Sequence, residues 1–370
     1  MRWATAAFLL GLSVGQVQAE TVKVGLAFHT AGLSNRAIAQ LRDGFELGLR
    51  HAATTSGPHQ LSLAILGPGD GEDAARLDAF VKQEAPRVLV AAQSRLEASA
   101  QLKSFSDSGI VVVSPGEGGA ELAGKRCLAN VFVTGAQANQ GFDTIAQYVD
   151  NSPLKRVVVV HDEAHAGRIE ALRRSAKTAF LRVVGIAVGD GEYDDDVEKL
   201  MLDQPQTVIL AGSATVSARF LRALRAHPIG REAVVIASAA GEESDLSEFG
   251  DMAVGLLAPG SWATGIEGQA NAEFVNAFTQ GFGAQPSSLA VYAYDAARLL
   301  GTALATISGP VTTKALRDAM HAANLASPRG ALTFSNNNFP IQNFYMKRIE
   351  AGEGGAFRSV PVARVFEQFA

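Results

Sequence analysis

Cysteine is almost absent from this 370-residue chain, because Cys127 is the only one. A single cysteine excludes an internal disulfide, and we expect Cys127 to be a small buried residue at the end of a loop. Basic residues are not in excess either, since 32 of them stand against 37 acidic ones and the net charge is −5. They are scattered along the chain, which argues against a nucleic-acid-binding protein.

Long hydrophobic runs are missing after residue 19. Within residues 1–19, Arg2 precedes a mainly apolar stretch at 4–14, and Ala19 is a small residue at the position before Glu20. This pattern predicts a secretory signal peptide cut after Ala19, because the apolar stretch is shorter than the ~20 residues that span a bilayer. A retained N-terminal anchor is the alternative.

The remaining composition is that of a folded protein. Hydrophobic residues make up 47% of the chain and charged residues 19%, which is typical of globular proteins and too apolar for disorder. A chain of this length can bury a sizeable core and predicts two domains or lobes.

A run of β-branched apolar residues at 110–113 ends in a glycine-rich turn. The run is too short for a buried helix and suits a parallel strand that is covered on both faces. Ser114, Pro115 and Gly116 follow it, with further glycines at 118 and 119. Ligands of open α/β sheets bind beyond the carboxyl ends of the strands. We therefore expect residues 114–119 to form one wall of a small-molecule cleft.

Predicted strands and helices alternate on both sides of this run, which indicates doubly wound parallel sheets in two α/β units. The first unit has predicted strands at 22–28, 61–66, 88–92 and 110–113, and helices at 36–53, 73–83 and 97–106. The second has helices at 137–149, 166–179, 194–202 and 216–226, and strands at 156–161, 182–188, 207–211 and 234–238. Helices at 268–282, 288–307 and 313–323 and strands at 331–334 and 344–349 complete the chain.

Motifs that would indicate an enzyme or a metal site are incomplete. Gly67-Pro-Gly-Asp-Gly71 lacks the spacing of a dinucleotide-binding turn. His161-Asp-Glu-Ala-His165 starts at a strand end and is not the H-E-x-x-H zinc motif. Asp190-Gly-Glu-Tyr-Asp-Asp-Asp196 lacks the alternating ligands of a calcium loop. We therefore expect no catalysis, no metal and no other cofactor.

Several fragments, taken in order, resemble the signatures of one family. They are Asp107-Ser-Gly-Ile-Val-Val-Val-Ser-Pro-Gly, Arg156-Val-Val-Val-Val-His-Asp, Glu248-Phe-Gly-Asp-Met-Ala-Val-Gly, Val291-Tyr-Ala-Tyr-Asp-Ala-Ala, Ser327-Pro-Arg-Gly-Ala-Leu-Thr-Phe and Pro340-Ile-Gln-Asn-Phe-Tyr. Together they resemble the type I periplasmic solute-binding proteins, near the leucine/isoleucine/valine-binding branch. The resemblance covers most of the mature chain.

This resemblance implies two lobes joined by three crossings near residues 135, 261 and 333. Lobe 1 would comprise 20–135 and 262–332, and lobe 2 would comprise 136–261 and 333–370. It also implies a monomer in the periplasm that captures a small solute between its lobes and delivers it to an ABC permease. A secreted receptor that reports its ligand to a sensor or regulator is the alternative.

The strand-end rule and the resemblance together place eight residues at the cleft. They are His29, Ser94, Arg95, Glu117, Gly118, His165, Ser213 and Glu242. Compared with amino-acid-binding members of the family, Arg95 falls close to the sequence position of a serine, and Gly118 close to that of a threonine. Ala239 falls close to the position of the acidic residue that holds the ligand's ammonium in those members. The aromatic residues that they commonly have near positions 166 and 214 are missing from this chain.

These departures predict a different solute. An arginine can hold a carboxylate through two parallel hydrogen bonds, so Arg95 is the predicted main anchor. An ammonium group would be buried without a partner unless Glu242 or Glu117 replaces the missing acid. We therefore expect a small polar organic solute that carries a carboxylate, rather than a free α-amino acid.

Overall fold

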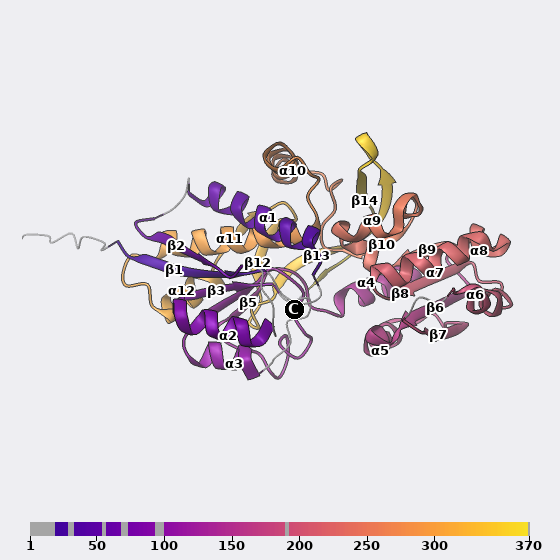
Figure 1. The fold of residues 1–370 in the computed structure, drawn as a ribbon, viewed down its shortest axis with the longest axis horizontal. Helices are drawn as coiled ribbons and strands as arrows, with labels where there is room; N and C mark the ends of the chain where they lie inside the picture. Colours follow the sequence, from indigo (N-terminus) through magenta and orange to yellow (C-terminus); the bar gives the residue numbers. More distant parts are fainter. Residues whose placement is uncertain are drawn as a thin grey trace, which may run out of the picture.

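A computed structural model describes residues 19–28, 33–53, 57–67, 73–92, 100–188 and 192–368. The predicted signal peptide lies outside these residues except for Ala19. The molecule consists of two α/β lobes that lie side by side along its long axis (Figure 1). Of the helices in the described part of the chain, none has both the length and the hydropathy of a membrane span.

The first lobe is built on a five-stranded parallel sheet with the order β2-β1-β3-β4-β5. Its strands are β1 (Thr21–Ala27), β2 (Gln60–Ile65), β3 (Val88–Ala91), β4 (Val111–Ser114) and β5 (Val131–Val133). Every residue of β3, β4 and β5 is buried, because helices cover both faces of the sheet, as short runs of β-branched residues predict.

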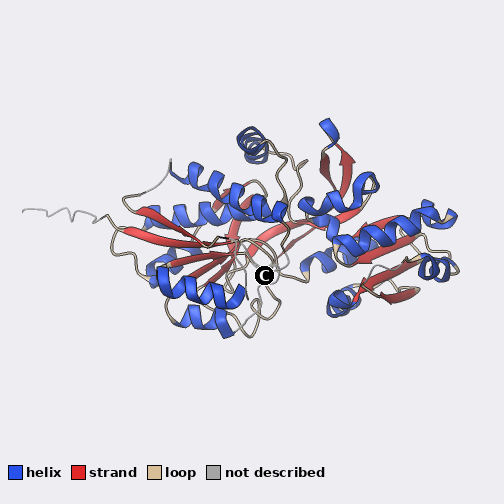
Figure 2. Cartoon of the chain, in the orientation of Figure 1, coloured by secondary structure: helices blue, strands red, loops and turns tan. Residues whose placement is uncertain are grey.

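Helices cover each face of this sheet (Figure 2). A separate apolar core lies between the sheet and the helices on each face. One face carries α1 (Asn35–Ala53), α11 (Ser288–Thr306) and α12 (Thr313–His321), and the other carries α2 (Asp73–Glu84) and α3 (Ala100–Asp107). Helix α10 (Gln269–Phe282) packs outside α1 and α11, where Phe274 and Phe278 are buried.

Helices α1 and α11 approach closely because small residues line their contact. A Cβ atom at Gly44 would lie 2.1 Å from the carbonyl oxygen of Ala290, and one at Gly48 would lie 2.5 Å from that of Tyr294. These distances leave room only for a hydrogen atom at each position. The close packing fixes the first turn of α11 beside the middle of α1.

The second lobe repeats the plan with parallel strands in the order β7-β6-β8-β9-β10. The strands are β6 (Val157–Asp162), β7 (Arg182–Ile186), β8 (Thr207–Ala211), β9 (Val234–Ala237) and β10 (Leu257–Gly260). One face is covered by α4 (Gln140–Asp150) and α5 (Ala166–Ser175), the other by α6 (Asp194–Met201), α7 (Ala214–Ala226) and α9 (Leu246–Phe249). A short helix, α8 (Pro228–Glu232), follows α7.

The C-terminal strands extend this second sheet in the antiparallel sense. They are β11 (Leu325–Ser327), β12 (Gly330–Phe334), β13 (Pro340–Ala351) and β14 (Phe357–Gln368). Strand β13 pairs with β12 at its start and with β10 and β14 further along. Since Leu332 and Phe334 of β12 belong to the core of the first lobe, β13 runs from one lobe into the other.

The fold class is confirmed, whereas the lobe boundaries at 135, 261 and 333 remain a prediction. Most predicted elements are present, but β5, β10 and β11 were not anticipated, because they have three or four residues and no clear alternation. The short helices α8 and α9 and the strand β14 were not anticipated either. Cys127 is exposed, contrary to expectation, because its loop runs over the surface. Partial burial still raises the pKa of its thiol.

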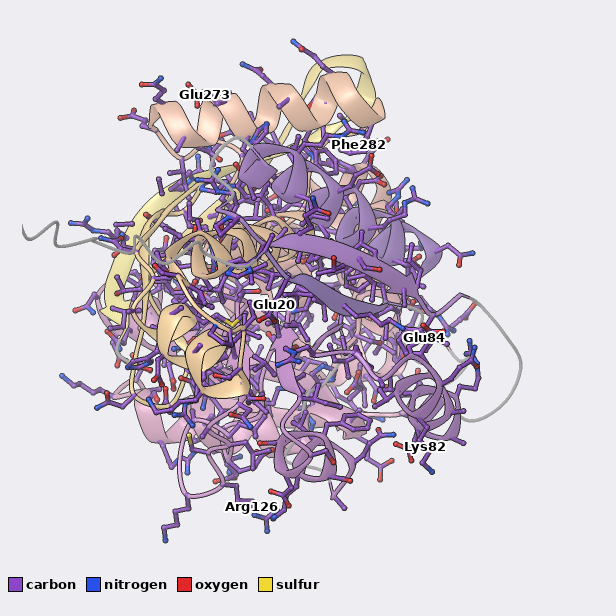
Figure 3. The ribbon with its side chains drawn as sticks, turned by 90° about the vertical axis from the view of Figure 1, so that its left-hand side faces the viewer. Glu20, Lys82, Glu84, Arg126, Glu273 and Phe282 are labelled. Carbon is purple, nitrogen blue, oxygen red and sulfur yellow. The ribbon has the colours of Figure 1, made fainter. Side chains whose placement is uncertain are left out.

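Some charged side chains at the end of the first lobe lie on separate elements. Viewed from the end of the first lobe, Lys82 of α2, Arg126 of a loop and Glu273 of α10 lie apart at the rim of the molecule (Figure 3). This agrees with the scattered charges of the sequence.

Two buried charge networks lie where the chain passes between the lobes. Arg329 donates to the carboxylate of Asp295 at 2.6 and 3.0 Å and to the carbonyl oxygen of Thr134 at 2.7 Å. Gln342 donates to the carbonyl oxygen of Gly135 at 2.8 Å. The first network therefore joins the segment after β5 to the start of β13.

The second network surrounds Lys347 of β13, whose side chain is fully buried. Its ammonium group donates to the carbonyl oxygens of Gly241 and Trp262 and forms an ion pair with Glu243. The Glu243 carboxylate also accepts hydrogen bonds from Ser288 and Ser359. Because Ser288 begins α11, this network links the second lobe to the first.

Candidate functional site

A cavity of about 750 Å³ lies between the lobes. From the first lobe, its wall contains Ala92 after β3, Pro115 to Glu117 after β4, and the first turns of α1 and α11. From the second lobe, it contains the segments that follow β6, β8 and β9. The cavity thus lies at the carboxyl ends of parallel strands from two sheets, where such folds bind ligands.

An aspartate–histidine pair occupies the end of β6. The Asp162 carboxylate accepts from the backbone N–H of Ser213 at 2.8 Å, and its other oxygen lies 2.5 Å from Nδ1 of His165. Burial alone would raise the pKa of Asp162, but the hydrogen bonds from Ser213 and His165 lower it below its usual range. Asp162 is therefore an anion that fixes the His165 ring in the cavity wall.

An ion pair joins the two lobes across the cavity. Nη2 of Arg168, in the first turn of α5, lies 2.9 Å from Oε2 of Glu117, in the loop after β4. The guanidinium carbon of Arg168 also lies 5.9 Å from the centre of the Phe142 ring. Both charged residues line the cavity.

Acidic residues gather at another part of the wall, after β9. Burial, together with the negative charges of Glu243 and Asp245, raises the pKa of Glu242 to about 8. Burial likewise raises the pKa of Asp245. At neutral pH, Glu242 is therefore mainly protonated and can donate a hydrogen bond. It becomes an anion readily if a cationic group is placed beside it.

Tyr292 of α11 faces the same cavity from the first lobe. Its hydroxyl lies 3.0 Å from the hydroxyl of Ser261, and burial raises its pKa to about 12. The phenol therefore stays protonated. The guanidinium of Arg329 lies 4.9 Å from the centre of its ring, so Tyr292 also contacts the first buried charge network.

The structure brings four of the eight predicted site residues to this cavity. They are Glu117, His165, Ser213 and Glu242. Gly118 does not line the cavity: a Cβ atom there would lie 2.5 Å from the Phe339 ring, inside the first lobe. His29, Ser94 and Arg95 lie outside the described residues, so their roles remain predictions. His161 lies beside Gly185 of the neighbouring strand, not with His165.

Arg168, Asp162, Asp245 and Tyr292 were not anticipated from the sequence. Asp162 directly follows the predicted strand at 156–161, so the strand-end rule could have identified it. Arg168 lies three residues after His165, which is the spacing of neighbours on one helical face. No sequence pattern indicated that Asp245 and Tyr292 line the cavity, because their positions depend on how the loop after β9 packs against α11.

These features define a two-lobed protein with a cavity of small-molecule size between its lobes. The profile of the periplasmic binding protein family matches residues 21–355. The chain therefore belongs to the periplasmic binding protein family. No curated protein sequence matches it.

Solved structures of ABC-transporter solute-binding proteins share the fold. One from R. palustris, in complex with benzoate, has 23% sequence identity and a TM-score of 0.78, covering 95% of this chain and 98% of that one. One from Rhodopseudomonas palustris BisB5, in complex with 3,4-dihydroxybenzoic acid, has 16% identity and a TM-score of 0.75, covering 94% and 97%. A branched-chain amino acid binding protein from Streptococcus pneumoniae, in complex with isoleucine, has 18% identity and a TM-score of 0.76, covering 92% and 99%.

Proposed function

We propose that this protein is the substrate-binding component of an ABC importer and that it captures a small carboxylate-bearing solute between its lobes. The observation that carries the proposal is the cavity of about 750 Å³ whose wall comes from both lobes. Such a cavity encloses a ligand only when the lobes close, which couples binding to a change of shape. The proposed ligand is the solute itself, and the proposed protein partner is an ABC permease in the inner membrane.

The charges of the wall support a carboxylate. Arg168 and His165 supply cationic or donor groups on the second-lobe side, and protonated Glu242 supplies a further donor. Two of the similar structures hold benzoate and 3,4-dihydroxybenzoic acid, both of which carry a carboxylate. Arg95 remains a predicted anchor.

A free amino acid is the second candidate ligand, and the acidic wall after β9 favours it. The sequence-based prediction disfavoured an ammonium group unless Glu242 or Glu117 replaced the missing acid, and both residues line the cavity. An ammonium beside Glu242 and Asp245 would lower the pKa of both carboxyls and be held as an ion pair. The isoleucine-bound structure is consistent with this candidate.

Isothermal calorimetry with a panel of aromatic acids, aliphatic acids and amino acids tests the ligand class. We expect heat of binding with at least one acid that lacks an ammonium group. Tight binding of leucine or valine, with no binding of such acids, would reject the carboxylate proposal in favour of the amino acid.

Export is tested separately from binding. If residues 1–19 are a signal peptide, the mature protein begins at Glu20 and is released with the periplasmic contents. An intact-mass measurement of the exported protein checks this, and a mass that includes residues 1–19 in the membrane fraction would contradict it.

The importer and the receptor alternatives differ in the partner. Permease and ATPase genes next to the gene for this protein would favour an importer. Uptake of the radiolabelled solute into vesicles that contain such a permease and ATPase is expected only for an importer. Size-exclusion chromatography with light scattering checks the expected monomer.

A further inference from the structure

The cavity wall contains little permanent positive charge. Among its residues that the structure describes, Arg168 is the only arginine or lysine, whereas four carboxyl groups line it: Glu117, Asp162, Glu242 and Asp245. Asp162 is held by His165 and by the backbone of Ser213. Arg168 is therefore the group in the described wall best able to balance a ligand carboxylate.

Arg168 is positioned by its own lobe. Its side chain is 20% exposed, and its guanidinium lies over the Phe142 ring. Its neighbours Ile169 and Leu172 anchor α5 in the core of the second lobe. The guanidinium would therefore stay in the wall if its partner left.

Glu117 is held less firmly. Its side chain is 40% exposed and belongs to the loop between β4 and β5 of the other lobe. Ion pairs with this much exposure contribute little to stability, because water screens the charges and solvates a released carboxylate. Glu117 can therefore exchange with another carboxylate at small cost.

We propose that the Glu117 carboxylate occupies, in the absence of ligand, the position that a solute carboxylate takes on Arg168. On binding, the solute carboxylate displaces Glu117 and pairs with Arg168. This inference rests on the proposed function. The arriving carboxylate can accept two parallel hydrogen bonds from the guanidinium, a strong and geometrically specific arrangement. A neutral solute cannot displace Glu117, so the pair selects for acids and keeps Arg168 neutralised until one binds.

Calorimetry on matched variants tests the exchange. The probes are benzoate, 4-hydroxybenzoate and acetate, the neutral amide benzamide, and isoleucine. The variants are Glu117→Gln, which removes the competing charge, Arg168→Gln, which removes the anchor, and Arg173→Gln as the control. Arg173 lies on the same helix, is about half exposed and pairs within that helix with Glu170.

For each acid that the wild type binds, we expect Glu117→Gln to bind about 3-fold more tightly, the size of an exposed ion pair. Arg168→Gln should bind at least about 10-fold more weakly, the effect of losing a charge-assisted hydrogen bond. Arg173→Gln should match the wild type, and circular dichroism melting checks that every variant folds.

Other outcomes overturn the proposal. If Glu117→Gln binds both the acids and benzamide more weakly, the Glu117–Arg168 ion pair only holds the two lobes together. Unchanged acid affinity in Arg168→Gln would assign the anchor elsewhere. If the wild type binds only benzamide, the exchange is refuted while solute capture stands. If it binds isoleucine, whose carboxylate can also displace Glu117, unchanged isoleucine affinity in Arg168→Gln refutes the exchange for that ligand. If no probe binds to any variant and the wider screen is also negative, the exchange and the proposed function fail together.

Discussion

Arg329 and Asp295 show why separate sequence fragments carry a family resemblance together. Asp295 belongs to the fragment at 291–297, Arg329 to the one at 327–334, and Gln342 to the one at 340–345. In the structure these three residues form one buried network with the backbone of Thr134 and Gly135. The three fragments are therefore joined physically in the fold, because their side chains meet in this network.

Removing Arg329 should therefore damage the fold strongly. In Arg329→Ala the Asp295 carboxylate stays buried without its cation, and we expect the free energy of unfolding to fall by about 3–5 kcal/mol. Urea denaturation measures the change. Arg317→Ala is the control, since Arg317 pairs with Asp318 on the surface of α12; an equal loss in both variants would contradict the role of burial.

Glu242 should make stability depend on pH. Its pKa is raised from the ordinary 4.5 to about 8 in the folded protein, so between these values the folded state holds a proton that the unfolded chain has lost. The free energy of unfolding should therefore fall as the pH rises from 5 to 8, by at most about 1.4 kcal/mol per pH unit for one proton. Urea denaturation across this range checks the slope.

Glu242→Gln should flatten that slope, because an amide does not titrate in this range. Glu170→Gln, which changes an exposed carboxylate on α5, should leave it as in the wild type. Identical slopes in the wild type and Glu242→Gln would show that Glu242 titrates normally.

At the scale of single residues, the sequence predicted positions better than interactions. Glu117, His165, Ser213 and Glu242 were placed at the cavity because strand ends determine where loops lie. Gly118 is not part of the cavity lining, because a Cβ atom there would lie against the Phe339 ring. The Glu117–Arg168 pair could not be predicted, because it depends on how two lobes distant in the sequence face each other.

At the scale of elements, periodicity predicted the long helices and buried strands within a few residues. Strand β10 was missed because its Leu-Ala-Pro-Gly sequence contains two residues, proline and glycine, that are unfavourable in strands. It forms because β9 and β13 pair with it on either side. The β13–β14 hairpin was only partly predicted, since tertiary pairing decides its length.

The contact between α1 and α11 should tolerate no added methyl group. Gly44→Ala would place its Cβ against the backbone of Ala290, and we expect the free energy of unfolding to fall by about 1–3 kcal/mol through overpacking. Thermal and urea denaturation measure it.

Gly281→Ala is the matched control, because Gly281 is also helical, in α10. The nearest atom to its Cβ would be 4.0 Å away, on Arg50. Alanine has the higher helix propensity, so this variant should gain up to about 1 kcal/mol. A similar loss in both variants would mean that helix contact is not the cause.

At the scale of the whole molecule, ligand binding should shift the lobes toward a more compact arrangement. A micromolar ligand supplies about 8 kcal/mol of standard binding free energy, enough to favour a closed state strongly. Small-angle scattering with a solute that calorimetry has identified should show a smaller radius of gyration. A solute that does not bind is the control, and an unchanged radius with the true ligand would indicate a rigid scaffold.

Strand β13 has a mechanical consequence for that motion. It is one continuous strand whose start pairs with β12 and whose later part is clamped between β10 and β14. A strand in a hydrogen-bonded ladder resists stretching and sliding, because either would break several bonds at once, but it yields to torsion, since sheets are twisted already. We therefore expect β13 to twist rather than stretch. The lobes can then rotate about the axis of this strand, but neither can translate along it.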